Sequence, residues 1–250
     1  MTPSASAGAA ISVVPRPHAD ALATRVVGVI RAPRATLEAV AATPRYAGVL
    51  AFTFLVSASC GALLLQTEVG QLALVDQWER TAAAFGRPVN DAQFAALAGA
   101  SQYGAVYAIV GALVSGPLVA VGLAALVMGA LRAAPGPAPG YRQVLAVVAH
   151  AGVILALRQA VAAPVSYARE TLGSPASLTL FVPMLDEGSM AARLFGIVDL
   201  FVIWWLIVVA TGLSILYRRP ALRLAFVLVG AYLALALVLA IVMAVAGGLA

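Results

Sequence analysis

Four side chains inside the apolar stretches of this sequence are candidates for chemistry: Cys60, His150, Arg158 and Asp199. Ionisable groups in apolar segments are costly, so they mark either functional sites or tightly paired contacts. An intramembrane aspartyl protease needs a second acid beside Asp199, and a zinc site needs three or more ligands. His18 is the only other histidine, and neither G-x-S-x-G nor a P-loop motif occurs. We therefore predict that the protein is not an enzyme and has no catalytic residue, cofactor or metal.

Arg158 and Asp199 lie at matching depths in two consecutive apolar segments. Arg158 comes six residues before Pro164, and Asp199 comes six residues after Arg193. At a rise of 1.5 Å per residue, both lie about 9 Å from the same boundary. Because consecutive helices commonly pack side by side, we predict an intramembrane ion pair between them. The alternatives are a proton-coupled site, or an Arg158 that extends to water while Asp199 bonds backbone or Ser groups.

The composition places these residues in a membrane. Hydrophobic residues make up 63% of the chain, charged residues 10%, and the mean hydropathy is +1.00. A bilayer core requires about 20 apolar residues per helix. Five segments qualify, namely residues 47–66, 103–131, 143–163, 194–217 and 224–250. We predict an all-α, polytopic membrane protein with five transmembrane helices, built from residues 47–250.

The distribution of arginine orients these spans. All 15 basic residues are Arg, and ten of them precede the first span or lie in the loops after the second and fourth spans. The two other loops hold four arginines together with seven acids. By the positive-inside rule, the N-terminus is cytoplasmic and the C-terminus lies outside. The exclusive use of Arg and the abundance of Ala are typical of a GC-rich bacterial genome, so we expect a multi-pass protein of the bacterial inner (cytoplasmic) membrane.

The chain before the first span has two parts. Residues 1–24 mix Pro, Ser, Ala and a few charges, and we interpret them as a disordered cytoplasmic tail. Residues 25–46 begin with RVVGVIRAPRATLEAV, which favours an amphipathic juxtamembrane helix. We predict that Arg25, Arg31 and Arg34 of this helix contact anionic lipid at the membrane surface. A plain packed linker helix is the alternative.

Part of the sequence is similar to a known family. The stretch SPASLTLFVPMLDEGSMAARLFGIVDLFVIWWLIVVATGLSILYRRP resembles the fourth-helix region of bacterial Yip-domain proteins, with Asp199, Phe201 and Trp204 at the places of a D-x-F-x-x-W-like core. YRQVLAVVAHA resembles the start of that family's third helix, and APRATLEAVAATPRYAG resembles its lead-in to the first span. The chain from about residue 25 onward thus resembles the Yip-domain (Ypt/Rab-interacting protein) family. The resemblance implies five spans and a cytoplasmic N-terminus.

Two functions remain open at this stage. Eukaryotic Yip-domain proteins bind prenylated Rab GTPases, but their D-L-Y-G-P signature is not found here, so Rab binding is not extended to this chain. We predict a non-enzymatic scaffold or membrane-organising component whose partners are membrane lipid and membrane or cytoplasmic proteins, a second copy included, and neither nucleic acid nor metal. The alternative is a small transporter or channel subunit with a polar path at His150, Arg158 and Asp199. A water-wide cavity reaching all three residues would favour that alternative.

Overall fold

The computed structural model describes residues 21–132, 136–182, 184 and 189–246, and the regular elements within them are all helices. In chain order they are α1 (Leu22–Arg31), α2 (Pro33–Ala42), α3 (Ala47–Leu65), α4 (Glu68–Ala84), α5 (Asp91–Ser101), α6 (Gly104–Leu131), α7 (Tyr141–Ala151), α8 (Val153–Arg169), the 3-10 helix η1 (Leu178–Phe181), α9 (Met190–Ile197), α10 (Leu200–Tyr217) and α11 (Ala221–Ala246). Five helical segments are long and apolar enough to cross a membrane: α3, α6, α7 with α8, α10 and α11. The prediction of an all-α fold with five such helices is confirmed. The predicted tail, residues 1–24, lies almost wholly outside the described residues.

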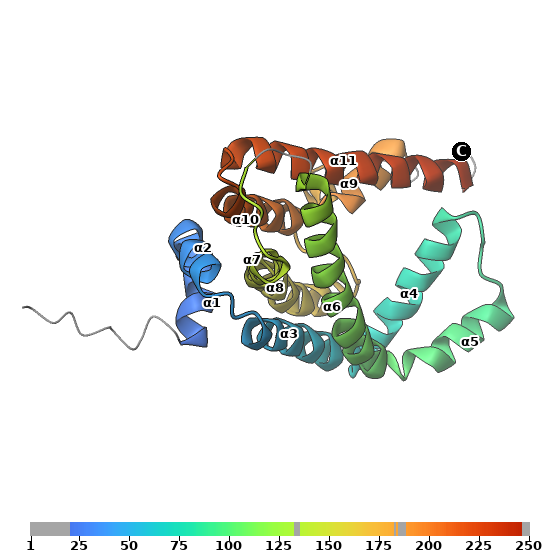
Figure 1. Cartoon of the computed structure of the whole chain (residues 1–250). Helices are drawn as coiled ribbons and strands as arrows, with labels where there is room; N and C mark the ends of the chain where they lie inside the picture. The colour runs from blue at the N-terminus through green and yellow to red at the C-terminus, as the bar shows by residue number, and fades with distance from the viewer. Residues whose placement is uncertain (1–20, 133–135, 183, 185–188, 247–250) are drawn as a thin grey trace, which may run out of the picture.

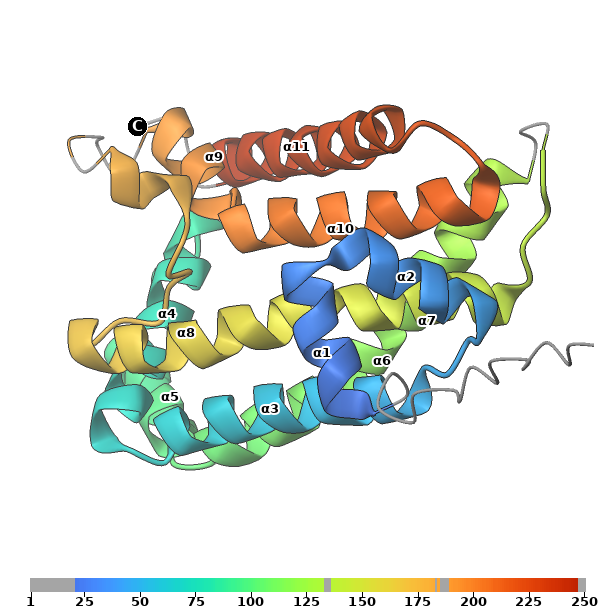
Figure 2. The same cartoon turned by 90° about the vertical axis from the view of Figure 1, so that its left-hand side faces the viewer.

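The long helices pack into a bundle with one central member. Figure 2 shows α3, the α7–α8 pair, α10 and α11 lying side by side, and α6 packs against α3 and α7 (Figure 1). In the most apolar part of α7–α8, 61% of the residues are buried, against 11% in α6 and in α11. The α7–α8 pair is therefore the core of the bundle, whereas α6 and α11 turn most of their apolar surface outward, as helices in contact with lipid do.

The fourth span begins at Leu200 rather than at residue 194. The residues from Met190 to Ile197 form the separate helix α9, and both Val198 and Asp199 have extended backbone angles. Asp199 is thus the N-cap of α10 rather than a residue two turns inside a helix. An Asp side chain accepts hydrogen bonds from the first free N–H groups of a helix, which explains why the helix starts there.

The third span is longer than the predicted 143–163, because it runs from Tyr141 to Arg169 with a break at Gly152. Its start is fixed by the side chain of Gln143, which accepts a hydrogen bond of 3.0 Å from the N–H of Gly140. Pro164 lies inside α8 and does not end it, since proline is tolerated in membrane helices whose freed backbone groups find other partners. The helix ends where Glu170 takes a left-handed conformation, with φ of 56°.

The juxtamembrane segment forms two helices rather than one. Ala32, between α1 and α2, has φ of −144°, and Pro33 is the first residue of α2. Proline disfavours a helical conformation at the residue before it, which accounts for the break. Val29, Leu37 and Val40 are buried, and α2 packs against α7 and α10. The apolar face of this segment is therefore covered mainly by the bundle.

Candidate functional site

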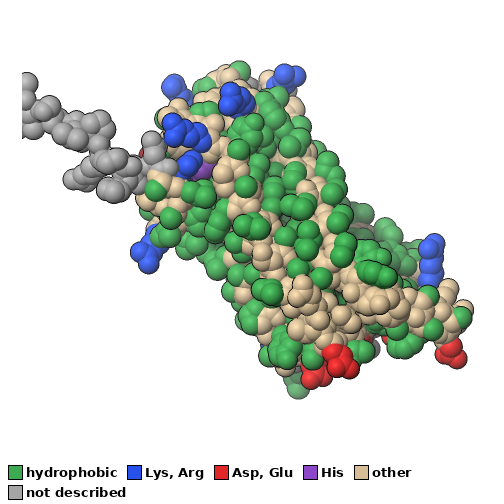
Figure 3. Space-filling model, turned by 90° about the horizontal axis from the view of Figure 1, so that it is seen from below, with side chains coloured by type: hydrophobic (Ala, Val, Ile, Leu, Met, Phe, Trp, Pro, Cys, Tyr) green, Lys and Arg blue, Asp and Glu red, His purple; other side chains and the backbone are tan. Residues whose placement is uncertain are grey.

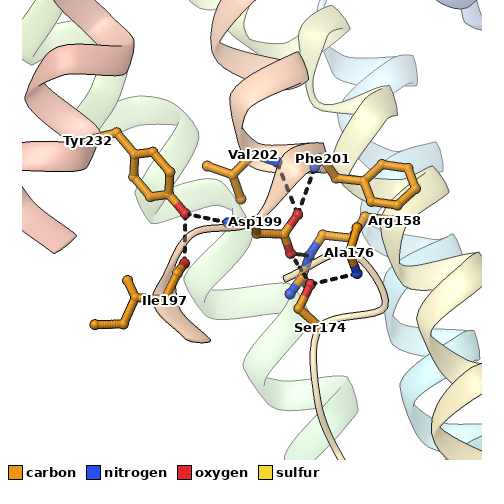
Figure 4. Close-up of polar contacts among 8 residues, drawn as sticks. All are labelled: Arg158, Ser174, Ala176, Ile197, Asp199, Phe201, Val202 and Tyr232. Atoms are coloured by element: carbon orange, nitrogen blue, oxygen red, sulfur yellow. Dashed lines mark hydrogen bonds and ion pairs between the residues drawn. The ribbon is translucent and has the colours of Figure 1, made fainter. Parts of the chain in front are cut away.

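The structure brings Arg158 of α8 and Asp199 at the start of α10 into direct contact (Figure 4). The Nε atom of Arg158 donates to Oδ2 of Asp199 over 2.6 Å. The carboxylate is 4% exposed and the arginine side chain is 31% exposed. The negative charge of the pair is therefore buried, while the arginine remains partly exposed.

The Asp199 carboxylate receives four hydrogen bonds in total. Its Oδ1 accepts from the backbone N–H groups of Phe201, at 2.7 Å, and Val202, at 3.3 Å. Its Oδ2 accepts from the Ser174 hydroxyl in addition to the arginine. Both carboxylate oxygens thus have hydrogen-bond partners within the protein. One oxygen caps the helix, and the other is paired with a cation.

The backbone around this cap is held by two further segments. The hydroxyl of Tyr232 in α11 accepts from the N–H of Asp199 over 3.1 Å and donates to the carbonyl of Ile197 over 2.8 Å (Figure 4). On the other side, Leu200 N–H donates to the Ala176 carbonyl over 3.1 Å, and Ser177 forms a bridge with Asp199. These bonds satisfy backbone groups that the break between α9 and α10 would otherwise leave unpaired.

The family-like motif combines this cap with an aromatic pair. Phe201 and Trp204 lie in the first turns of α10, and their ring centroids are 6.2 Å apart with an angle of 32° between the planes. Both are partly buried and pack against the main core. The motif residues Asp199, Phe201 and Trp204 therefore start α10 and seat its first turns on the bundle.

His150 lies apart from the ion pair. It is fully buried in α7, and its Nδ1 is 2.8 Å from the carbonyl of Ala146 in the same helix. This hydrogen bond is made one turn back in its own helix. Arg158 comes eight residues after His150, which corresponds to about 12 Å along the helix axis. Cys60 is a free cysteine in α3, and no group of three or more possible metal ligands occurs among the described residues.

Two cavities lie between α3, α6 and the α7–α8 pair. The outer cavity has a volume of about 480 Å³ and is lined by Arg158 and Ser174 among others. The inner cavity has a volume of about 260 Å³ and extends to Trp205. Neither His150 nor Asp199 lines either of them. Neither of these two cavities joins the three side chains of the transport alternative.

The three arginines of the juxtamembrane segment have different surroundings. Arg25 is half-buried, and its guanidinium donates to the carbonyl of Arg45 over 3.3 Å. Arg31 and Arg34 are exposed, and Arg34 forms an ion pair of 3.1 Å with Glu38 one turn later. Two apolar side chains of the same segment remain exposed, Val27 at 45% and Ile30 at 38%.

Ser174 and Tyr232 are the site residues that sequence reasoning missed. Tyr232 had a signal, because a tyrosine hydroxyl inside an apolar span needs a hydrogen-bond partner. The signal for Ser174 was weaker. A Ser hydroxyl commonly accepts a hydrogen bond from the backbone N–H two residues later and so forms a local turn, and here Ser174 accepts from the N–H of Ala176 over 3.2 Å. Neither signal names Asp199 as the partner, because both contacts join segments far apart in the sequence.

The sequence of the chain matches a known protein family. The family model described as the Yip1 domain matches residues 27–243, which is most of the chain. Searches among curated proteins and among solved structures found no match.

Proposed function

Because the chain belongs to the Yip1 domain family, we propose that this multi-pass membrane protein is a non-enzymatic scaffold that organises the membrane around it through lipid and protein contacts. We place it in the bacterial inner membrane, with its N-terminus in the cytoplasm and its C-terminus outside. The observation that carries the proposal is a cationic surface at one end of the bundle, formed around α1 and α2.

The charge distribution supports an interaction with anionic headgroups. Figure 3 shows most of the visible arginine side chains gathered at one end of the molecule, whereas the acidic side chains are seen mainly at the opposite end, where a further arginine lies beside them. The surface between them is largely apolar. Arg31 and Arg34 project from the cationic end beside the exposed Val27 and Ile30. Basic groups flanked by apolar side chains are a pattern typical of contact with an anionic leaflet.

The packing of α1 and α2 makes this surface rigid. Their buried residues fix them to α7 and α10, so the two arginines are presented from a folded support rather than from a mobile tail. A preorganised cationic surface loses less conformational entropy on binding than a disordered one. We propose Arg31 and Arg34 as the main membrane-surface contacts, with Arg25 holding the segment against the bundle through Arg45.

The outward faces of α6 and α11 are the proposed surfaces for protein partners, a second copy of the chain included. Leu118 and Leu126 of α6 and Phe226 and Val245 of α11 are each at least 65% exposed. In a membrane these side chains contact lipid, and helices pack there through van der Waals contact. A partner helix can therefore pack against these faces without any rearrangement of the helices within the bundle.

The test is the lipid composition around the full-length protein. We expect polymer-extracted native discs of the wild type to be enriched in anionic lipid over the bulk membrane. The double substitution Arg31→Gln and Arg34→Gln should reduce that enrichment several-fold, since each arginine near the surface contributes about 1 kcal/mol. The matched control is Arg87→Gln with Arg169→Gln, which removes the same charge from the opposite end. Equal lipid composition in all three proteins would refute the proposal.

A further inference from the structure

The inner and outer cavities adjoin each other and together make up a hollow between α3, α6 and the α7–α8 pair. Ser57 of α3 and Ala112 of α6 line both of them. Along α3 the residues that line the hollow run from Leu65 to Leu50, which corresponds to about 22 Å of helix rise. Of the residues that form the ion pair and the helix cap, Arg158 and Ser174 line its outer part.

The outer part of the hollow contains more polar groups than the inner part and carries one positive charge. Arg158 is the only charged residue among the described residues that line it. The Asp199 carboxylate is 4% exposed and occupied by its own hydrogen bonds, so it does not contribute to the wall. Only Nε of Arg158 is bonded to Asp199, and a guanidinium has four further N–H donors. Gln77, Gln159 and Ser166 add neutral hydrogen-bonding groups around it.

The inner part is lined mainly by apolar side chains. Leu50, Phe54, Val119, Leu155 and Trp205 contribute to its wall, and no charged residue does among those described. Its volume of about 260 Å³ lies just below the roughly 300–1,000 Å³ typical of ligand pockets, which leaves room for one hydrocarbon chain rather than two. A ligand that satisfies both parts must have an anionic group at one end and an apolar chain at the other.

We propose that this hollow binds one single-chain anionic amphiphile, with its headgroup on Arg158 and its acyl chain directed towards Trp205. The shared chemistry is that of a fatty-acid carboxylate or a lysophospholipid phosphate. A guanidinium fork binds either anion through paired N–H donors. The site is separate from the cationic surface around α1 and α2, so its failure would leave the proposed scaffold function standing.

Trp205 provides a direct readout. The chain has three tryptophans, and a background with Trp78→Phe and Trp204→Phe keeps Trp205 as the only one. In detergent-purified full-length protein, we expect dibromostearate to quench Trp205 saturably at one ligand per protein. Its uncharged methyl ester should bind at least tenfold more weakly, which is about 1.4 kcal/mol. An unbrominated lysophosphatidic acid should displace dibromostearate and restore the fluorescence if the phosphate is accepted, and failure to restore it would assign the site to the carboxylate.

Two substitutions on α6 test the location. Ala112→Phe fills the junction of the two cavities, whereas Val114→Phe adds similar bulk on an exposed face of the same helix. We expect the first to abolish saturable quenching and the second to leave it unchanged. Replacing both Arg158→Met and Asp199→Asn should remove the preference for the acid over the ester without leaving an unpaired charge. Unsaturable quenching in the wild type, equal quenching by acid and ester, or quenching that survives Ala112→Phe would overturn the proposal.

Discussion

Replacing Arg158 with Met tests the ion pair most directly, because it removes the guanidinium and keeps a long apolar side chain. The Asp199 carboxylate, which is 4% exposed in the unchanged protein, would then keep three of its four hydrogen bonds and lose its countercharge. Breaking a buried pair from one side costs about 3–5 kcal/mol. Since the arginine is 31% exposed, we expect a smaller loss of about 2–4 kcal/mol in the free energy of unfolding.

Asp199→Asn is the matched partner substitution. An amide oxygen still accepts from the N–H groups of Phe201 and Val202, so the cap of α10 is preserved while the charge is removed. The stranded guanidinium can turn towards the outer cavity, so we expect a loss of about 1–2 kcal/mol. The double variant strands no charge, and its loss should be smaller than the sum of the two by about 2 kcal/mol.

The assay is unfolding of the purified protein in mixed micelles, followed by tryptophan fluorescence, with the four proteins of the cycle compared in one detergent. Asp199→Ala serves as a control for the cap, because it should lose about 1 kcal/mol more than Asp199→Asn. Losses that add up in the double variant would show that Arg158 and Asp199 do not stabilise each other, and the structural ion pair would be refuted.

Three further predictions concern topology and packing. A reporter fused after Ala250 should be exported, and one in the loop between α6 and α7 should remain cytoplasmic; a cytoplasmic C-terminal fusion would contradict the five-span orientation. Gly212→Ala should lower the free energy of unfolding by about 1–3 kcal/mol, since a Cβ there would collide with a valine of α7. Gly230→Ala, which meets nothing within 4 Å, is its control and should be neutral or stabilising. Tyr232→Phe should cost about 1–3 kcal/mol by stranding two backbone groups, whereas the exposed Tyr103→Phe should cost nothing measurable in the same unfolding assay.

The spacing of Arg158 and Asp199 in the sequence was enough to predict that they could meet. Ionisable residues are so few in the apolar segments that each has a small choice of partners, and the predicted span order set their depths. The break before Leu200 was not predictable from hydropathy, because the apolar run LFGIVDLF continues on both sides of the acid. What ends α9 there is a set of contacts from Tyr232 and Ala176, which only the folded chain brings together.

The juxtamembrane segment illustrates a different limit. Its hydrophobic periodicity indicates an apolar face, but an apolar face is buried equally well by a membrane or by neighbouring helices. The structure covers Val29 and Leu37 with protein and leaves Val27 and Ile30 exposed. Periodicity alone cannot tell which of these apolar side chains contact protein and which stay exposed, since that depends on how α2 packs against α7 and α10.

An acid at the start of a membrane helix accepts hydrogen bonds from the backbone N–H groups of the first turn as well as carrying a charge. The first N–H groups of α10 have no partner within the helix, and lipid provides none. Asp199 satisfies two of them, and Arg158 balances the charge that this requires. Protonating the carboxylate would weaken the charge pair and both cap bonds together, so proton exchange there would destabilise the fold. The group with free donors and a cavity before it is Arg158, so the proposed ligand binds the arginine and not the acid.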